Sequence, residues 1–169
     1  MQPFYDREAV KPMWEELAAC GVKPLTTAAE VDEALAKPGT TMVMVNSVCG
    51  CAAGGARPGV TKALQGDVIP DHLTTVFAGL DREAADHARA RMTGVAPSSP
   101  MVAIFKDGEI VFALERRYIE RMHVDQIAEV LTSAFREYCT AKGPSVPADV
   151  YAKVVHAKMC GSQIPTFRG

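Results

Sequence analysis

The chain has 169 residues, of which 48 % are hydrophobic and 22 % charged, and its formal net charge is −2. These are ordinary values for a globular chain with a sizeable core, and the lack of basic excess argues against a nucleic-acid-binding surface. No hydrophobic run approaches the length of a membrane span, and the N-terminus lacks the basic and hydrophobic segments of a signal peptide. We therefore expect a cytoplasmic protein with no membrane partner.

The first part of the chain predicts two helices. Hydrophobic residues recur at helical spacing over residues 6–19, and Gly21 follows as a typical helix-ending residue. Pro12 suits the first turn of a helix, so the regular helix is predicted to begin near it. Thr27 and Glu30 have the spacing of a capping box and predict the start of the second helix.

A hydrophobic run over residues 41–47 predicts a buried strand, and it leads directly into Cys49-Gly50-Cys51. Small residues follow, and a helix is predicted to run to about Leu64, with a new segment or kink at Pro58. The two cysteines therefore lie at a strand-to-helix junction. Unpaired backbone amides and the helix dipole favour an anion there, and a thiolate is the nucleophilic form of cysteine.

The spacing of Cys49 and Cys51 narrows the chemistry. A disulfide between residues two apart is tight, and strained, accessible disulfides are more easily reduced than structural ones. Such a pair suits the transfer of a disulfide to or from a partner. Two alternatives remain: buried cysteines that happen to lie close together, and half of a metal site, although a lone C-x-C lacks a second ligand pair.

The rest of the chain alternates between strands and helices. A helix is predicted between Asp81, as its cap, and Gly94, and a clear amphipathic helix is predicted over 124–138. Asp107-Gly108 is a hairpin turn signal. Further strands are predicted at 73–78, 101–105 and 110–114. This order predicts an α/β fold with a mixed central sheet and helices on both faces.

The end of the chain is separate in character. Residues 1–139 are predicted to form the α/β domain, and 140–169 a C-terminal extension with a linker and a short helix over 148–159. A helix of this length is not stable alone in water, so we expect its hydrophobic stripe to dock on the domain or on a second copy. Cys160 is then either incidental or a third thiol for the cysteine pair. The stripe consists of Val150, Tyr151, Val154 and Val155.

The element order resembles the thioredoxin fold, in which redox cysteines follow a central strand and a cis-proline precedes the hairpin. Ser99-Pro100 has the position of that proline, so we expect a cis bond close to the Cys49 sulfur. More narrowly, four stretches resemble the bacilliredoxin family, also described as disulfide-isomerase-like, from about residue 7 to Cys139. These stretches are Val45-Asn46-Ser47-Val48-Cys49-Gly50-Cys51-Ala52-Ala53-Gly54, Ala56-Arg57-Pro58, Val76-Phe77-Ala78-Gly79 and Ala96-Pro97-Ser98-Ser99-Pro100.

The resemblance implies an oxidoreductase that reduces mixed disulfides between protein cysteines and bacillithiol, a small thiol co-substrate, without a tightly bound cofactor. Cys49 would be the attacking thiolate and Cys51 the resolving thiol. Pro100 would shape the substrate groove, together with Gly50 and Ser99. The partners of the enzyme would be S-thiolated proteins and the low-molecular-weight thiol.

Several alternatives stay open. Arg57 is also assigned to the groove, where it would favour a thiolate or a small-thiol carboxylate, although a solvated arginine is the simpler interpretation. The residues do not distinguish bacillithiol from glutathione, or a reductase from a protein disulfide isomerase. A soft-metal carrier that uses Cys49, Cys51 and Cys160 is the second class of function.

Overall fold

The computed structural model describes residues 1–167 and contains a five-stranded sheet with the order β1-β4-β2-β5-β6. β1, β4 and β2 are parallel, and β2-β5 and β5-β6 are antiparallel. Central β2 is buried along its whole length because both of its faces are covered. The strands are β1 (Lys23–Pro24), β2 (Thr40–Asn46), β4 (His72–Phe77), β5 (Met101–Lys106) and β6 (Glu109–Leu114).

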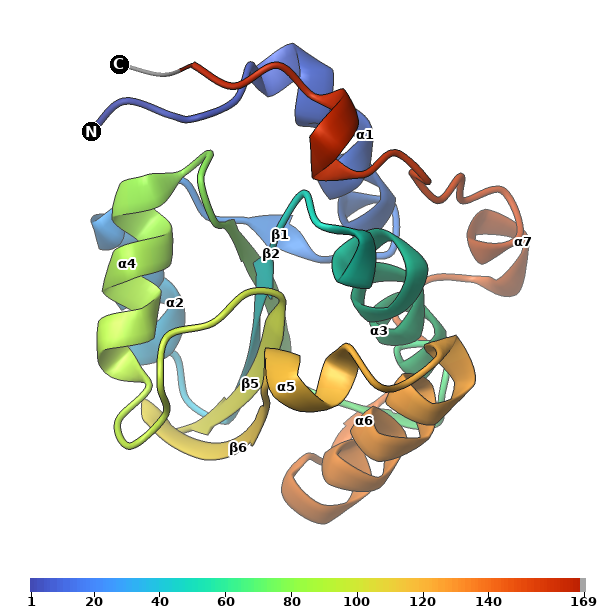
Figure 1. Ribbon diagram of the computed structural model, residues 1–169. Coiled ribbons are helices and arrows are strands. Elements are labelled where there is room, and N and C mark those ends of the chain that lie inside the picture. The colour runs from blue at the N-terminus through green and yellow to red at the C-terminus, as the bar shows by residue number, and fades with distance from the viewer. Residues whose placement is uncertain (168–169) are drawn as a thin grey trace.

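Helices cover both faces of this sheet, as the sequence predicts (Figure 1). α2 (Ala28–Ala36) and α4 (Arg82–Arg91) lie on one face, where Val43 and Val45 of β2 pack. The α3–α6 face takes Met42 and Met44, the alternate residues of the same strand. It is covered by the π-helical turn η1 (Ala52–Ala56), α3 (Arg57–Ala63) and α6 (Val124–Tyr138). The topology is that of a thioredoxin-like α/β fold.

Local signals account for most element boundaries. Thr27 and Glu30 form the predicted capping box of α2, with both reciprocal hydrogen bonds present. Gly21 has a φ of +85°, as expected after a helix, and Asp107 and Gly108 have φ values of +49° and +83° in the hairpin turn.

One predicted helix start is wrong, and one predicted cap makes no hydrogen bond although its helix begins where expected. α1 (Arg7–Ala18) begins five residues before Pro12, because Asp6 accepts a hydrogen bond from the Glu8 backbone and caps the helix there. Asp81 stands at the start of α4 but makes no capping hydrogen bond. Its carboxylate instead pairs with Arg7 on α1.

The helix after the cysteines changes its winding just before Pro58. The backbone N–H of Arg57 donates to the Ala52 carbonyl, which makes η1 a π-turn, and α3 begins at Arg57. Pro58 has no N–H to continue an α-helical ladder, so a new segment starts there as predicted. Gly59 then allows close approach of α6, since a Cβ on it would lie 2.6 Å from the Ile127 Cγ2.

The C-terminal extension is ordered but differs from its prediction. β7 (Ala141–Lys142) pairs with β3 (Val68–Ile69) where a linker was expected, and α7 covers only Ala148–Tyr151. Residues 152–160 form no helix, so the helix predicted over 148–159 is wrong beyond its first turn. A hydrophobic stripe stabilises a short helix only if it is covered, and Val155 is 83 % exposed.

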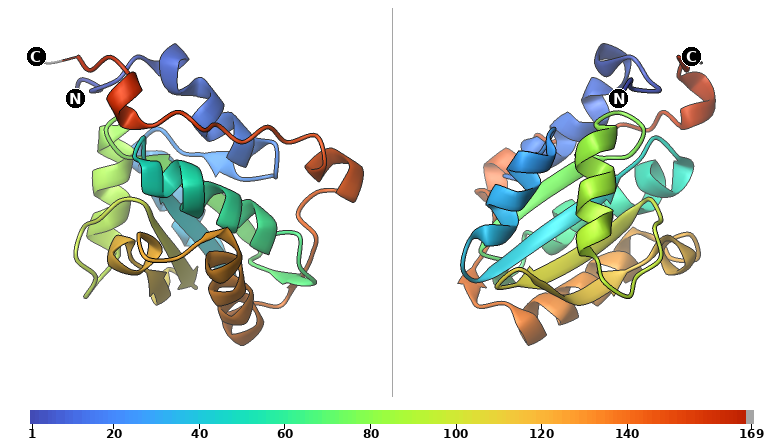
Figure 2. Two further views of the ribbon diagram at one scale, coloured as in Figure 1. Left: turned by 45° about the vertical axis from the view of Figure 1, so that its right-hand side comes forward. Right: turned by 90° about the vertical axis from the view of Figure 1, so that its left-hand side faces the viewer.

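The extension nevertheless docks on the domain, through other residues. It runs between α1 and α3 toward the N-terminus (Figure 2). Ile164 is buried, and Thr166 forms a β-bridge with Tyr5. Ile164 belongs to a cluster that joins α1 to the ends of β2 and β4: Val10, Met13, Val48, Phe77, Leu80 and Ile164. Residues 168 and 169 of the predicted extension lie outside the described residues.

Candidate functional site

Cys49 lies at the start of the helix that follows β2, as the sequence predicts. Its carbonyl accepts hydrogen bonds from the backbone N–H groups of Ala52 (3.1 Å) and Ala53 (3.2 Å). Its own N–H donates to the Ser47 hydroxyl oxygen over 3.2 Å, and that hydroxyl donates to the Cys49 sulfur over 3.0 Å. Helix start and hydroxyl both favour a negatively charged sulfur at this position.

Cys51 has a different environment from Cys49. Both thiols are free and half-buried, but Cys51 packs against the hydrophobic cluster under α3 and α6. Burial raises the pKa of Cys51, and the neighbouring Cys49 raises it further. The pair therefore combines a sulfur that accepts a hydrogen bond with a second thiol that stays protonated at neutral pH.

The Ser99-Pro100 bond is cis, as predicted. It immediately precedes β5, whose first residue, Met101, pairs with Val45 near the end of β2. The loop with Pro100 and the loop with Cys49 therefore leave neighbouring strands at the same end of the sheet. Direct contact of Pro100 with the Cys49 sulfur stays a prediction.

Arg116 is a site residue that sequence reasoning missed. It opens the short helix α5 (Arg116–Ile119), and its Nη1 donates to the Ser99 carbonyl over 3.1 Å. Its charge also lowers the pKa of Cys51, against the larger effect of burial. A cation therefore joins the cis-proline loop to the cysteine pair. A four-residue helix is too short to show a hydrophobic pattern in the sequence. The adjacent basic residues Arg116 and Arg117 were the sequence feature that could have pointed to a positive charge here.

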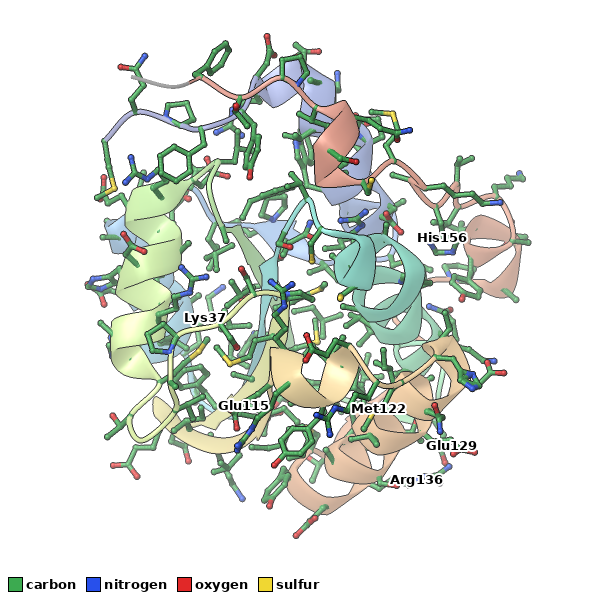
Figure 3. The ribbon with its side chains drawn as sticks, viewed as in Figure 1. Lys37, Glu115, Met122, Glu129, Arg136 and His156 are labelled. Atoms are coloured by element: carbon green, nitrogen blue, oxygen red, sulfur yellow. The ribbon has the colours of Figure 1, made fainter. Side chains whose placement is uncertain are left out.

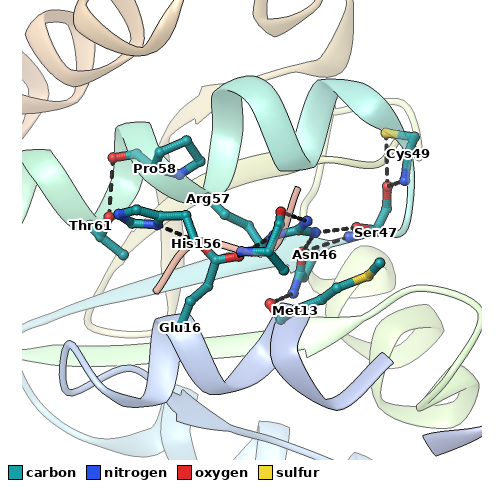
Figure 4. A network of polar contacts seen from close by, with 10 residues as sticks. Met13, Glu16, Asn46, Ser47, Cys49, Arg57, Pro58, Thr61 and His156 are labelled. Atoms are coloured by element: carbon teal, nitrogen blue, oxygen red, sulfur yellow. Dashed lines mark hydrogen bonds and ion pairs between the residues drawn. The ribbon is translucent and has the colours of Figure 1, made fainter. Parts of the chain in front are cut away.

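Arg57 lies neither in the groove nor in solvent, so neither predicted alternative for its position holds. Its side chain has no exposed surface, and its Nε forms an ion pair with the Glu16 Oε1 over 2.7 Å. Its Nη1 donates to the Ser47 carbonyl over 2.7 Å (Figure 4). The π-turn explains the difference, because one extra residue rotates the side chains that follow by about 100° around the helix. Arg57 thus lies behind the cysteine loop.

The third-thiol and metal alternatives depend on Cys160. Its sulfur lies 2.8 Å from the Ser162 hydroxyl oxygen, and hydrogen bonding by Ser162 lowers its pKa. Within residues 1–167, no three His, Cys, Asp or Glu side chains are grouped so that they could hold a metal ion. The predicted arrangement of Cys49, Cys51 and Cys160 as metal ligands is therefore not formed.

No helix in the described part of the chain combines the length and the hydrophobicity needed to cross a membrane.

Comparison with known proteins places this site in a family. The family model described as disulphide isomerase matches residues 5–139. A bacilliredoxin of Cytophaga hutchinsonii is 49 % identical over 134 residues, which are 79 % of this chain and 99 % of that protein. A bacilliredoxin of Staphylococcus aureus is 47 % identical over 136 residues, which are 80 % of this chain and 94 % of that protein.

Among solved structures, mitochondrial thioredoxin 3 of Saccharomyces cerevisiae matches with a TM-score of 0.49 and 16 % identity. That match covers 71 % of this chain and 98 % of the thioredoxin. The family match, the bacilliredoxin relatives and the cysteine pair at a helix start support a thiol–disulfide oxidoreductase. By its sequence matches, the chain belongs to the bacilliredoxin family, which the matching model describes as disulphide isomerase.

Proposed function

We propose that this protein reduces mixed disulfides between protein cysteines and bacillithiol, or a similar small thiol. The observation that carries the proposal is the unequal cysteine pair. Cys49 stands at a helix start with a hydroxyl donating to its sulfur, and Cys51 is a thiol whose pKa burial raises. The names of the similar bacilliredoxins support bacillithiol as the small thiol.

The first step is attack by the Cys49 thiolate on the small-thiol sulfur of the mixed disulfide. A new disulfide forms between Cys49 and the small thiol, and the protein partner leaves as a thiolate that takes up a proton. No net oxidation occurs, because one disulfide replaces another. The Ser47 hydroxyl, 3.0 Å from the sulfur, stabilises the attacking anion.

The second step releases the small thiol. Cys51 loses its proton and attacks the Cys49 sulfur, so a Cys49–Cys51 disulfide forms and the small thiol leaves. The short spacing makes this disulfide tight and therefore readily reduced. Two molecules of the free small thiol then reduce it, become a small-thiol disulfide, and restore both cysteines.

Substrate contacts are assigned to the loops at this end of the sheet. Apart from its chain neighbours, Gly50 has no atom within 4 Å of the position a Cβ would take, so its side of the loop is open. Ser99 and Pro100 form the opposing loop, and Arg116 supplies a positive charge beside it. In this proposal Arg116, rather than Arg57, attracts a carboxylate of the small thiol.

The test is intact-mass spectrometry after incubation with a protein–bacillithiol mixed disulfide. We expect Cys51→Ser to accumulate one small-thiol adduct on Cys49, and Cys49→Ser to form none. Equal release of the small thiol by Cys49→Ser and the wild type would reject the assignment. A parallel glutathione mixed disulfide tests the choice of thiol.

A second assay separates the isomerase alternative. Recovery of a substrate with scrambled disulfides, faster than reduction of the mixed disulfide, would favour protein disulfide isomerase activity. Metal analysis of reduced protein addresses the carrier alternative, which requires a stoichiometric soft metal ion.

A further inference from the structure

A buried ion pair lies directly behind the cysteine loop. The side chains of Glu16, on α1, and Arg57, at the start of α3, are both without exposed surface, and their closest atoms are 2.7 Å apart. Buried ion pairs contribute little to stability compared with hydrophobic residues of similar size, since both charges lose their hydration. The packing of α1 against α3 alone does not explain this pair.

The arginine end of the pair holds the residue that contacts the Cys49 sulfur. Arg57 Nη1 donates to the Ser47 carbonyl over 2.7 Å and to the Asn46 Oδ1 over 3.2 Å. The same Asn46 oxygen accepts the Ser47 N–H over 2.9 Å, and the Asn46 amide donates to the Met13 carbonyl. Ser47 is therefore fixed at both of its backbone groups, and its hydroxyl donates to the Cys49 sulfur.

The glutamate end of the pair is held by the C-terminal extension. Figure 3 shows His156 on the part of the extension that passes alongside α1 and α3. Its Nδ1 lies 2.6 Å from the Glu16 Oε2, and the Ala157 N–H donates to the Glu16 Oε1 over 3.2 Å. Arg57 Nη2 donates in turn to the Ala157 carbonyl over 3.3 Å. Residues 156 and 157 lie outside the family match, which ends at 139.

The charges of Glu16 and Arg57 act on Cys49 as well as on one another. Burial lowers the pKa of Arg57, whereas Glu16 and then Cys49 raise it, and the guanidinium stays protonated. Coulomb interactions are reciprocal, so the same guanidinium favours the Cys49 thiolate, and Glu16 opposes it. On the α5 side, Arg116 lowers the pKa of Cys51 and Glu120 raises it.

We propose that Arg57 is a positioning residue for Cys49, and that the extension, through His156 and Ala157, sets the strength of this effect by holding Glu16. This inference rests on the proposed role of Cys49 as the reactive thiol. It gives the extension a part in the reaction without any contact to substrate.

The test measures the alkylation of Cys49 by iodoacetamide as a function of pH, quantified on the Cys49 peptide in a Cys51→Ser background. The midpoint is the pH at which the rate is half of its maximum. Glu16→Gln leaves the arginine charge unopposed, so the midpoint should fall. Glu16→Gln combined with Arg57→Met removes both charges, and the midpoint should then rise by about one pH unit relative to Glu16→Gln alone.

The signs separate an electrostatic role from a purely structural one. If loosening of the fold were the only effect, both variants would move the midpoint in the same direction or not at all, which would overturn the proposal. The double variant carries no unpaired buried charge, which favours its folding. Arg57→Lys keeps the positive charge, so its midpoint should stay close to that of the protein with Arg57. Arg136→Met, which breaks an exposed ion pair, should not move the midpoint.

The role of the extension has its own pair of variants in the full-length chain. His156→Ala removes one hydrogen-bonding partner of Glu16. The negative charge of Glu16 is then less compensated and opposes the Cys49 thiolate more strongly, so the midpoint should rise. Val155→Ala changes an adjacent, exposed side chain and should leave the midpoint unchanged. Equal midpoints for the two variants would reject the part assigned to the extension. Because alkylation needs no disulfide substrate, these results stand even if the proposed reductase reaction is wrong.

Discussion

Gly161 in the C-terminal extension lies against Val48, the residue that precedes Cys49. A Cβ on Gly161 would lie 2.8 Å from the Val48 Cγ2 and 3.4 Å from the Val48 carbonyl oxygen. Val48 is itself buried among residues of α1 and the extension, so it has little room to move. The extension and the cysteine loop therefore meet at a contact that only glycine permits.

This contact predicts that Gly161→Ala lowers the free energy of unfolding by about 1–3 kcal/mol, the usual range for added atoms in a packed site. Gly54→Ala is the matched control, because nothing lies within 4 Å of its Cβ position. Urea denaturation followed by fluorescence of Trp14, the single tryptophan, provides the measurement. Equal midpoints of unfolding for the two variants would contradict the close contact.

The ion pair of Glu16 and Arg57 predicts a large loss of stability when one partner is removed. Glu16→Ala or Arg57→Met leaves a buried charge without its partner, and we expect about 3–5 kcal/mol less unfolding free energy. Arg136→Met breaks an exposed pair with Asp67 and should lower it far less, because solvent screens the two charges. Urea titrations of the three variants make the comparison, and similar losses in all three would refute it.

Ser47→Ala should reduce the reactivity of Cys49. The hydroxyl donates to the Cys49 sulfur over 3.0 Å, and a hydrogen bond to a charged group contributes about 1.5–3 kcal/mol. We expect alkylation of Cys49 at neutral pH to slow by about tenfold, because sulfur is a weaker acceptor than oxygen. Ser162→Ala is the control, since Ser162 contacts Cys160 instead. An unchanged rate for Cys49 in Ser47→Ala would show that the hydroxyl does not stabilise the thiolate.

The cysteines outside the pair, Cys20, Cys139 and Cys160, should differ sharply in their reactivity toward an alkylating reagent. Burial, with a smaller contribution from Glu16, raises the pKa of Cys20 to about 11, and burial also raises the pKa of Cys139. At pH 8 both are therefore protonated as well as shielded, whereas Cys160 is partly exposed and its pKa is lowered. Differential alkylation before and after unfolding should label Cys49 and Cys160 first. Labelling of Cys20 in the native protein at the rate of Cys160 would contradict the structure.

The sequence by itself determined the elements and the position of the cysteines. The capping box of Thr27 and Glu30, the Asp107-Gly108 turn and the continuous hydrophobic run of β2 depend on neighbours a few residues apart. Such short-range preferences are legible without coordinates, and so was the cis bond before Pro100, from its position in the resembled fold. The same holds for the placement of Cys49 at a helix start.

Only the tertiary structure decided what surrounds these cysteines. The partners Glu16 and Arg57 are 41 residues apart in the chain, and Glu16 and His156 are 140 apart. No periodicity links such positions, and Arg57, which follows the π-turn, lies in the interior with its partners rather than in the expected groove. The extension's stripe predicted a helix, but its backbone groups and His156 found partners on α1 and α3 instead. Long-range pairing of buried polar groups therefore decided both outcomes, because these groups must be satisfied wherever the packed chain brings them together.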